Sequence, residues 1–303
     1  MFKRILLVVL TNILVVVTLS IVIGVLSRVL GINLYGSTYG SLFFLCFVWG
    51  MGGAFISLAM SRFMAKWMMG VHVIDPDNAG EYQNLVRTVH NLARKADLAA
   101  MPEVGVYESP EVNAFATGPS KSRSLVAVST GLLQRMNSDQ IEGVLGHEIT
   151  HISNGDMVTM TLVQGVINAF VMFFARIVAF AISTALRGKD SDRESSMGGF
   201  WMNYLLISVL EVVFGLLGYI VVARFSRWRE FRADQGGAEY AGRGKMISAL
   251  RQLQLFYGKV PEMQQQGNAS VATLKISGKQ GGFLSLMATH PPLEERIARL
   301  QAG

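Results

Sequence analysis

The sequence is poor in charge and almost free of cysteine. Charged residues make up 16% of its 303 residues, compared with about 25% in a typical soluble domain. Apolar residues make up 51%, so the composition excludes an ordinary soluble enzyme and indicates a membrane protein. The one cysteine, Cys46, cannot form an intrachain disulfide, and nothing in the framework therefore requires an oxidising compartment.

Four apolar stretches account for this composition: residues 5–26, 39–60, 157–186 and 198–223. The first two contain no charged residue, and each is long enough to cross a hydrocarbon core of about 30 Å as a helix. A cleavable signal peptide is the competing interpretation of the first stretch. Its apolar run exceeds the usual length of about 7–15 residues and no small-residue cleavage site follows it, which favours a transmembrane helix.

The third and fourth stretches each contain a single charge, Arg176 and Glu211. A lone charge inside a hydrophobic helix is costly and usually faces protein or water, often with a partner. The two residues lie at similar distances from the polar loop that joins the stretches, so a hairpin would place them at similar depth. We predict that they face each other or a shared polar cavity; the alternative is that each reaches separately toward an interface.

The positive charges lie beside the apolar stretches. Lys3 and Arg4 precede the first, Arg62 and Lys66 follow the second, and a group of arginines follows the fourth: Arg224, Arg227, Arg229 and Arg232. This is the distribution of cytoplasmic flanks under the positive-inside rule, so both termini and the polar regions are expected in the cytoplasm. The formal net charge of +6 is therefore assigned to the membrane surface, and no nucleic-acid partner is expected.

The chain accordingly divides into four parts. Residues 1–60 are expected to form a transmembrane hairpin and residues 157–223 a second hydrophobic hairpin, while residues 61–156 and 224–303 are the two halves of a polar domain. Apolar periodicity in these halves predicts a small sheet among helices. The expected strands cover residues 103–107, 113–117 and 125–128, the expected helices cover residues 82–93, 230–240, 245–257 and 293–300, and residues 264–282 are expected to form a loop.

A metal-binding motif lies on another predicted helix. Residues 147–151 read His-Glu-Ile-Thr-His, and Ser138 is the expected N-cap of the helix that carries them. Residues four apart share a helix face, so His147 and His151 could bind one zinc ion while Glu148 reaches water as the general base. The string also arises by chance, but the amphipathic helix around it favours the metallopeptidase interpretation.

A catalytic zinc needs a third protein ligand. No histidine stands at the spacing after His151 that a three-histidine site requires, since Asn154 and Met157 occupy those positions. Glu230 is the best candidate, and Asp234, four residues later on the same helix face, could hold a ligand histidine by its other ring nitrogen. The alternative for these acids is a pair of ordinary solvated carboxylates.

The order of segments permits this convergence. Two apolar stretches separate His151 from Glu230, and an even number of crossings returns the chain to the same side of the membrane. Both residues lie within a few helical turns of the apolar stretches, so the site is expected about 9–11 Å from them, beside the bilayer surface. Cleavage would then occur in water next to the membrane and not within it.

The motifs together resemble those of the HtpX-type membrane metalloproteases, bacterial relatives of the CAAX-prenyl endopeptidases. The resemblance covers nearly the whole chain and rests on residues 147–151 (HEITH), 229–234 (REFRAD), 113–118 (NAFATG) and 289–296 (THPPLEER). It implies an α+β membrane protein with a mainly α-helical, zincin-like (gluzincin) catalytic domain, a small β-sheet and four transmembrane or membrane-embedded helices.

The same resemblance implies one zinc ion per chain, with His147, His151 and Glu230 as ligands and Glu148 as the general base. It also implies a protease of the bacterial inner membrane, whose site faces the cytoplasm and which removes misfolded or damaged membrane proteins during stress. Its partners would be membrane-protein or peptide substrates and the lipid bilayer; the sequence predicts no oligomeric state. A prenyl-protein processing endopeptidase and a non-enzymatic membrane scaffold with structural zinc are the competing functions.

Two further residues are weaker candidates. His290, held in an extended segment before two prolines, could make a polar contact with substrate or transition state, or could form structural bonds only. Asn113 begins a predicted strand that could pair with an extended substrate, or could be an ordinary core strand.

Overall fold

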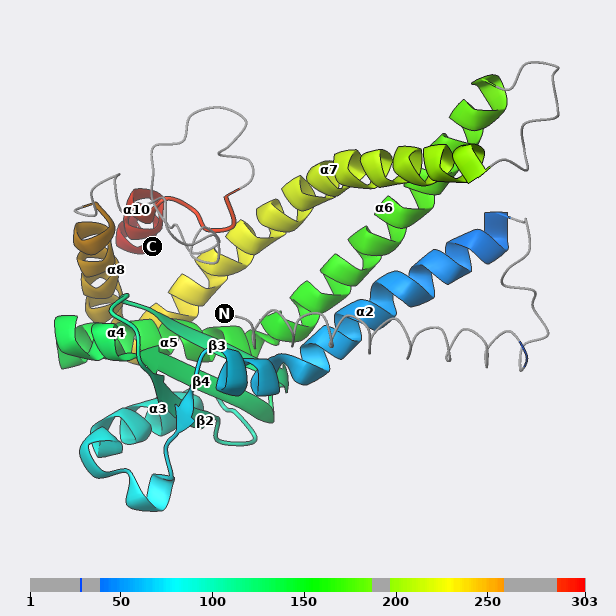
Figure 1. The fold of residues 1–303 in the computed structure, drawn as a ribbon. Helices are drawn as coiled ribbons and strands as arrows, with labels where there is room; N and C mark the ends of the chain where they lie inside the picture. The colour runs from blue at the N-terminus through cyan, green and yellow to red at the C-terminus, as the bar shows by residue number, and fades with distance from the viewer. Residues whose placement is uncertain (1–27, 29–38, 187–196, 259–287, 303) are drawn as a thin grey trace. The chain divides into compact units, whose positions relative to one another are not determined.

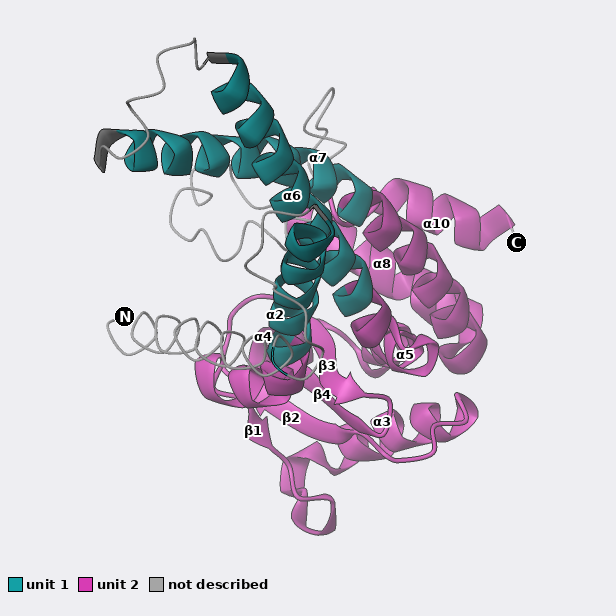
Figure 2. Cartoon of the chain, turned by 90° about the vertical axis from the view of Figure 1, so that its right-hand side faces the viewer, with its two compact units in different colours: residues 1–57, 161–222 teal, residues 58–160, 223–303 magenta. Residues whose placement is uncertain are grey.

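A computed structural model describes residue 28 and residues 39–186, 197–258 and 288–302 (Figure 1). The first apolar stretch, residues 5–26, and the expected loop at residues 264–282 lie outside the described residues. The chain divides into two compact units, shown in Figure 2: Met1–Ser57 with Thr161–Val222, and Leu58–Met160 with Ala223–Gly303. We call them the apolar unit and the polar unit.

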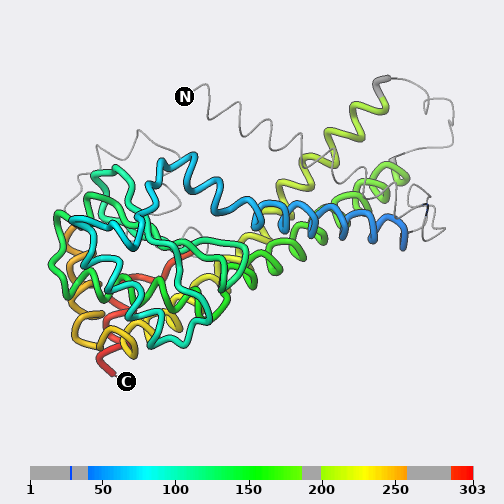
Figure 3. The backbone as a smooth tube through the Cα atoms, turned by 90° about the horizontal axis from the view of Figure 1, so that it is seen from below, coloured from blue at the N-terminus to red at the C-terminus, as the bar shows by residue number. Residues whose placement is uncertain are grey.

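Three helices in the described residues are long and apolar enough to cross a membrane. The first two lie within α2 (Tyr39–Met68) and α6 (Asp156–Leu186), and the third, Gly199–Tyr257, begins in α7 (Met197–Gly237) and continues beyond it. Helices α2, α6 and α7 are blue, green and yellow-green in Figure 3. Because three of the four predicted apolar stretches are helices of this kind, the prediction of a membrane protein is confirmed.

Small residues allow two of these helices to approach closely within the apolar unit. A Cβ added at Gly50 of α2 would lie 2.6 Å from the backbone nitrogen of Ala169 and 2.9 Å from the carbonyl oxygen of Gly165, both on α6. Hydrophobic contact does not drive helix association in lipid, so close backbone packing of this kind is what stabilises the pair.

The two isolated charges of the apolar unit are paired, as predicted. Nη1 of Arg176 on α6 donates a hydrogen bond of 2.8 Å to Oε1 of Glu211 on α7. The same nitrogen donates to the carbonyl oxygen of Met172 at 2.9 Å. The pair joins the two helices at a point where each would otherwise carry a lone charge.

The polar unit contains a four-stranded sheet in the order β1-β2-β4-β3. Its strands are β1 (His72–Val73), β2 (Glu103–Tyr107), β3 (Ala114–Ser120) and β4 (Arg123–Ser129). Strands β2 and β4 are parallel, whereas β1 pairs antiparallel with β2 and β3 pairs antiparallel with β4. Strand β3 therefore forms one edge of this sheet, and β1, which is only two residues long, was not predicted.

Five helices complete the polar unit among the described residues. They are α3 (Gln83–Lys95), α4 (Thr130–Arg135), α5 (Ser138–Asn154), α8 (Arg243–Gly258) and α10 (Leu293–Ala302), with single 3-10 turns at Pro76–Asn78 and Gly80–Tyr82. The core joins α3, β4 and α5 through fully buried side chains such as Val89, Val126 and Leu145. This packing fixes α5, the helix that carries the His-Glu-Ile-Thr-His motif, against the sheet.

Two predicted helix boundaries were wrong. The N-cap of α5 is Asn137 and not Ser138: the Asn137 side chain accepts the backbone N–H of Gln140, and the Gln140 side chain accepts the N–H of Asn137. This reciprocal capping box satisfies two donors at once. The helix expected at residues 230–240 is the end of α7, which continues to Gly237 and is followed by a π-helical turn at Ala238–Gly242.

The end of α5 is set by Gly155. Its φ of +70° lies in the left-handed region, which glycine adopts without steric cost, and its N–H bonds back to the carbonyls of His151 and Ile152. A new helix, α6, begins at the next residue, Asp156. The turn therefore places an acidic side chain just beyond the motif.

Candidate metal centre

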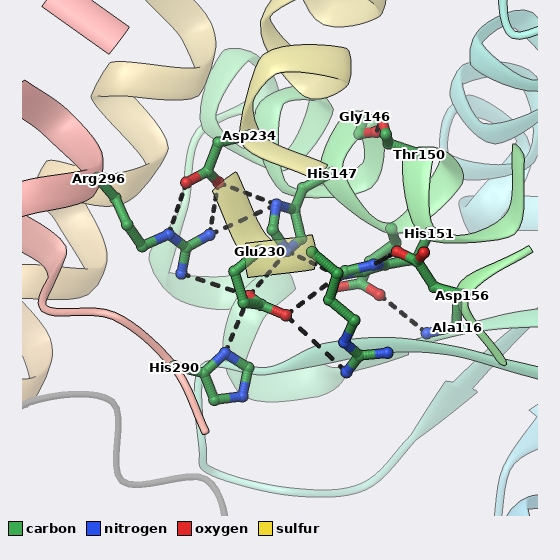
Figure 4. Close-up of polar contacts among 12 residues, drawn as sticks. Ala116, Gly146, His147, Thr150, His151, Asp156, Glu230, Asp234, His290 and Arg296 are labelled. Carbon is green, nitrogen blue, oxygen red and sulfur yellow. Dashed lines mark hydrogen bonds and ion pairs between the residues drawn. The ribbon is translucent and has the colours of Figure 1, made fainter. Parts of the chain in front are cut away.

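Helix α5 brings the two motif histidines together. His147 and His151 are one turn apart, both are buried, and their Nε2 atoms lie 3.1 Å apart (Figure 4). Two neutral imidazoles that each keep a proton on Nδ1 would direct their Nε2 lone pairs at one point. A shared cation at that point is the interaction that such an arrangement favours.

Glu230 of α7 completes the group, although it is far away in the sequence. Its Oε2 lies 3.4 Å from Nε2 of His147, and its Oε1 lies 3.4 Å from Nε2 of His151. The three candidate ligand atoms, one from each of these residues, all lie within 4.8 Å of one another. The structure thus brings together the three residues that the sequence motifs selected.

These distances fit a bound divalent ion. Zinc–nitrogen bonds of about 2.0–2.1 Å at a tetrahedral angle separate two ligand nitrogens by roughly 3.3 Å, and a carboxylate oxygen at a similar bond length gives a similar separation. The Glu230 side chain is only 1% exposed, and neither of its oxygens has a hydrogen bond of good geometry among the described residues. A buried carboxylate in that state requires a cation, so the residues fit a metal ion.

Each histidine is held from behind by a carboxylate. Nδ1 of His147 donates to Oδ1 of Asp234 at 3.0 Å, and Nδ1 of His151 donates to Oδ2 of Asp156 at 2.6 Å. These bonds select the tautomer in which Nε2 is free for a metal. The position of Asp234 matches the expectation from its spacing, whereas Asp156 was missed because it follows the end of the motif helix.

The pKa values of two of these residues depart from their ordinary values. Burial lowers the pKa of His147, but the hydrogen bonds to Asp234 and Glu230 outweigh burial and raise that pKa from 6.5 to about 9. Burial raises the pKa of Glu230, but its contacts with His147, His151 and His290 hold it well below its usual value. Glu230 is therefore ionised at neutral pH, as a metal ligand must be.

The segment before α10 and α10 itself also reach the site. Nδ1 of His290 lies 2.9 Å from Oε2 of Glu230, and the Arg296 side chain, which is 4% exposed, contacts Asp234 through two nitrogens. His290 was predicted to make a polar contact in the cleft, and it lines the pocket that His147 and Glu230 also line. Arg296 was missed as a site residue, although it belongs to one of the quoted motifs.

Glu148 faces the sheet edge. Its Oε2 accepts the backbone N–H of Ala116, on β3, at 2.9 Å. Along an antiparallel strand, the backbone N–H and C=O groups of successive residues point alternately toward and away from the neighbouring strand. The carbonyl oxygen of Asn113, just before β3, points toward β4 and accepts the N–H of Ser129 at 2.9 Å. The backbone groups of Ala114 therefore point the same way as those of Ala116, away from β4 and toward the pocket, which Asn113 and Ala114 also line.

Comparisons with known proteins agree with this geometry. The family model described as "Peptidase family M48" matches residues 80–303. A "Protease HtpX homolog" from Methylacidiphilum infernorum is 53% identical over 99% of both chains, and one from Bacillus licheniformis is 50% identical over 100% of both.

Among solved structures, the crystal structure of S. mikatae Ste24p has a similar fold, with a TM-score of 0.60 at 17% sequence identity. The match covers 96% of this chain but only 65% of the Ste24p chain. The expected α+β membrane fold with a zincin-like His-His-Glu group is thereby confirmed, as is the resemblance drawn from the motifs. The chain belongs to peptidase family M48.

Proposed function

We propose that this membrane metallopeptidase is a zinc-dependent endopeptidase in which His147, His151 and Glu230 bind one zinc ion. The convergence of the three ligand atoms within 4.8 Å of one another is the observation that carries the proposal. Two nitrogens and one carboxylate oxygen are a ligand set that catalytic zinc uses, with a further position left for water or substrate. Among the described residues, this group contains three possible ligands and not the four of a closed structural site.

Glu148 is assigned as the general base. It lies next to the first ligand on the same helix, and its carboxylate is held by the Ala116 amide at the edge of the pocket. Zinc at this site would polarise the scissile carbonyl and acidify water. Glu148 would accept the proton of the attacking water and pass it to the leaving amine.

An extended substrate is assigned to the edge of β3. The outward N–H and C=O groups of Ala114 are available for a further strand, and such pairing binds a peptide backbone without regard to its sequence. Asn113, at the start of this edge, and His290, beside Glu230, both line the pocket. We assign Asn113 to substrate contact and His290 to polar contact with substrate or transition state.

The catalytic domain is assigned to residues 61–156 and 224–303. The hydrophobic hairpin of residues 1–60 precedes its first half, and the hairpin of residues 157–223 joins the two halves. Basic residues at the ends of the apolar helices support a cytoplasmic domain under the positive-inside rule. From the resemblance we further assign the protein to the bacterial inner membrane, where it would cleave misfolded or damaged membrane proteins. Prenyl-protein processing is the alternative, favoured only by the fold that the chain shares with Ste24p.

Metal analysis combined with a peptidase assay tests this function. Full-length protein in detergent is assayed on an unfolded fluorogenic polypeptide, as wild type and as Glu148→Gln, Glu230→Ala and Glu239→Gln. Glu148→Gln should retain zinc and lose hydrolysis, whereas Glu230→Ala should lose both. Glu239, an exposed acid shortly after the end of α7, is the matched control and should match wild type.

Two results would refute the assignment. Continued hydrolysis by Glu148→Gln would remove Glu148 as the general base. Full zinc occupancy in Glu230→Ala would remove the third ligand.

A further inference from the structure

A buried arginine stands behind the metal centre. Nε of Arg296 donates to Oδ2 of Asp234 at 2.8 Å, and its Nη2 donates to Oδ1 at 2.6 Å. The second of these oxygens also accepts the Nδ1–H of His147. A continuous chain of contacts therefore runs from α10 through α7 to the histidine on α5 (Figure 4).

The docking of α10 does not require this arginine. Leu293, Ile297 and Leu300 bury the apolar face of α10 against Met246 and Leu250 of α8. Placing a charged pair in a protein interior is costly, and well-packed apolar side chains in its place are often as stable or more stable. A stabilising role is thus a poor explanation for Arg296, and its position behind the ligands points to another.

Charge balance supplies a reason for a cation at this position. Three carboxylates around the two histidines are almost fully buried: Glu230, Asp234 and Asp156. A divalent ion neutralises two of these negative charges, and the guanidinium of Arg296 neutralises the third. The buried group is then electrically neutral when the ion is bound, which avoids the cost of uncompensated charge in a medium of low dielectric.

Geometry supplies a second reason. The two parallel hydrogen bonds from the guanidinium fix the plane of the Asp234 carboxylate, which lysine cannot do with a single ammonium. The fixed Oδ1 in turn sets the ring orientation of His147 and keeps its proton on Nδ1. In addition, Nη1 of Arg296 lies 3.8 Å from Oε2 of Glu230, so the same side chain attracts a second ligand.

We propose that Arg296 is a positioning residue for the metal centre, which holds Asp234 and thereby aims Nε2 of His147 at the ion. The inference rests on the proposed function, because it takes His147 as a zinc ligand. Arg296 touches neither substrate nor metal in this scheme. Its loss should weaken metal binding and change the ligand geometry of the ion.

The experiment compares full-length Arg296→Met and Arg296→Lys with a matched control, Arg299→Met. Arg299 lies on the same helix but is exposed; it pairs with Glu295 of its own helix and stacks over the Phe231 ring of α7. Competition with a chromophoric chelator measures the zinc dissociation constant, and the visible spectrum of the cobalt-substituted protein reports ligand geometry. Thermal unfolding of the metal-free forms measures the structural contribution.

Arg296→Met should weaken zinc binding about 10–100-fold, the usual effect of removing a group that orients a ligand. Arg296→Lys should fall between Arg296→Met and wild type, since it keeps the charge but not the paired hydrogen bonds. Arg299→Met should keep wild-type affinity. The cobalt spectrum should change only in the Arg296 variants. Arg296→Met should also lower the metal-free unfolding midpoint, because it leaves the buried Asp234 carboxylate without its partner, so the spectrum and the zinc affinity of the folded protein carry the test.

A cycle with Asp234→Asn tests the route of the effect. If Arg296 acts through Asp234, adding Arg296→Met to Asp234→Asn should change zinc affinity by much less than it does in wild type. Full additivity would overturn the inference, as would wild-type affinity with an unchanged cobalt spectrum in Arg296→Met. If Arg296→Met does not fold, Arg296→Lys decides, and wild-type affinity in that variant overturns the inference.

The outcomes separate this inference from the proposed function. A wild-type protein that binds no zinc would refute the function itself. A wild-type protein that binds zinc and hydrolyses peptides, while the Arg296 variants bind zinc equally well, would refute only the role of Arg296.

Discussion

Removing one member of the Arg176–Glu211 pair should destabilise the apolar unit unequally. Glu211→Leu leaves a guanidinium that cannot lose its proton among apolar helices. Arg176→Leu leaves a carboxylate, which can become neutral by protonation. We therefore expect Glu211→Leu to cost more stability than Arg176→Leu, and the double variant to cost less than Glu211→Leu alone.

The magnitude follows from the cost of a charge in lipid. An unpaired charge at the centre of a membrane helix costs about 2.5–3.5 kcal/mol on insertion scales, while a neutral hydrogen bond between such helices contributes about 0.6 kcal/mol. The contact between Arg176 and the Met172 carbonyl remains in Glu211→Leu and offsets part of the cost. We expect about 2 kcal/mol for Glu211→Leu and about 1 kcal/mol or less for Arg176→Leu.

Reversible unfolding in mixed detergent micelles measures these free energies for wild type, both single variants and the double variant. The double-mutant cycle should give a coupling energy of about 1–2 kcal/mol between the two positions. Ser208→Ala, on the same helix as Glu211, is the control; Ser208 donates to the Tyr204 carbonyl of its own helix. Additive effects, or a larger loss for Arg176→Leu, would refute the reasoning.

Three further predictions concern the polar unit. Zinc binding at pH 7 should release about one proton from His147, because its metal-free pKa is about 9 and only the neutral ring binds metal. Zinc affinity should therefore rise with pH up to about pH 9. Titration calorimetry in buffers of different ionisation enthalpy measures the number of protons released on zinc binding, and finding none would contradict the prediction. Asp156→Asn should weaken zinc binding about 10–100-fold, since Asp156 orients His151; equal affinity in a chelator competition would exclude that role. Gly143→Ala should destabilise the unit by about 1–3 kcal/mol, because the new Cβ would lie 2.7 Å from the Lys245 carbonyl oxygen, and an unchanged denaturant midpoint would disprove the close packing.

Elements marked by a regular spacing of apolar residues could be predicted from the sequence. Strand β2 has the predicted bounds, because its alternating run is short and lies between turn residues. The motif helix was also predicted, since its apolar residues recur at helical spacing. The pairing of Arg176 with Glu211 followed from a simpler constraint, the cost of leaving either charge alone in an apolar helix.

Several contacts around the site could not be predicted. Arg296 meets Asp234 across 62 residues, and no period or spacing in the sequence links these two residues. Asp156 reaches His151 only because Gly155 turns the chain at that point. The two-residue strand β1 is too short to show any alternation. Asn137 and Ser138 both have side chains that can cap a helix. The reciprocal hydrogen bonds between Asn137 and Gln140, which decide between them, appear only in the structure.

The separation of the site residues along the chain also orders the steps of biosynthesis. His147 and Arg296 are 149 residues apart, an interval that a ribosome adding about 5–20 residues per second takes roughly 7–30 s to translate. During that time α6 and α7 emerge while the histidine pair still lacks Glu230 and then its supporting arginine. If the proposed ligands are correct, a nascent chain should enter the bilayer before its metal centre is complete.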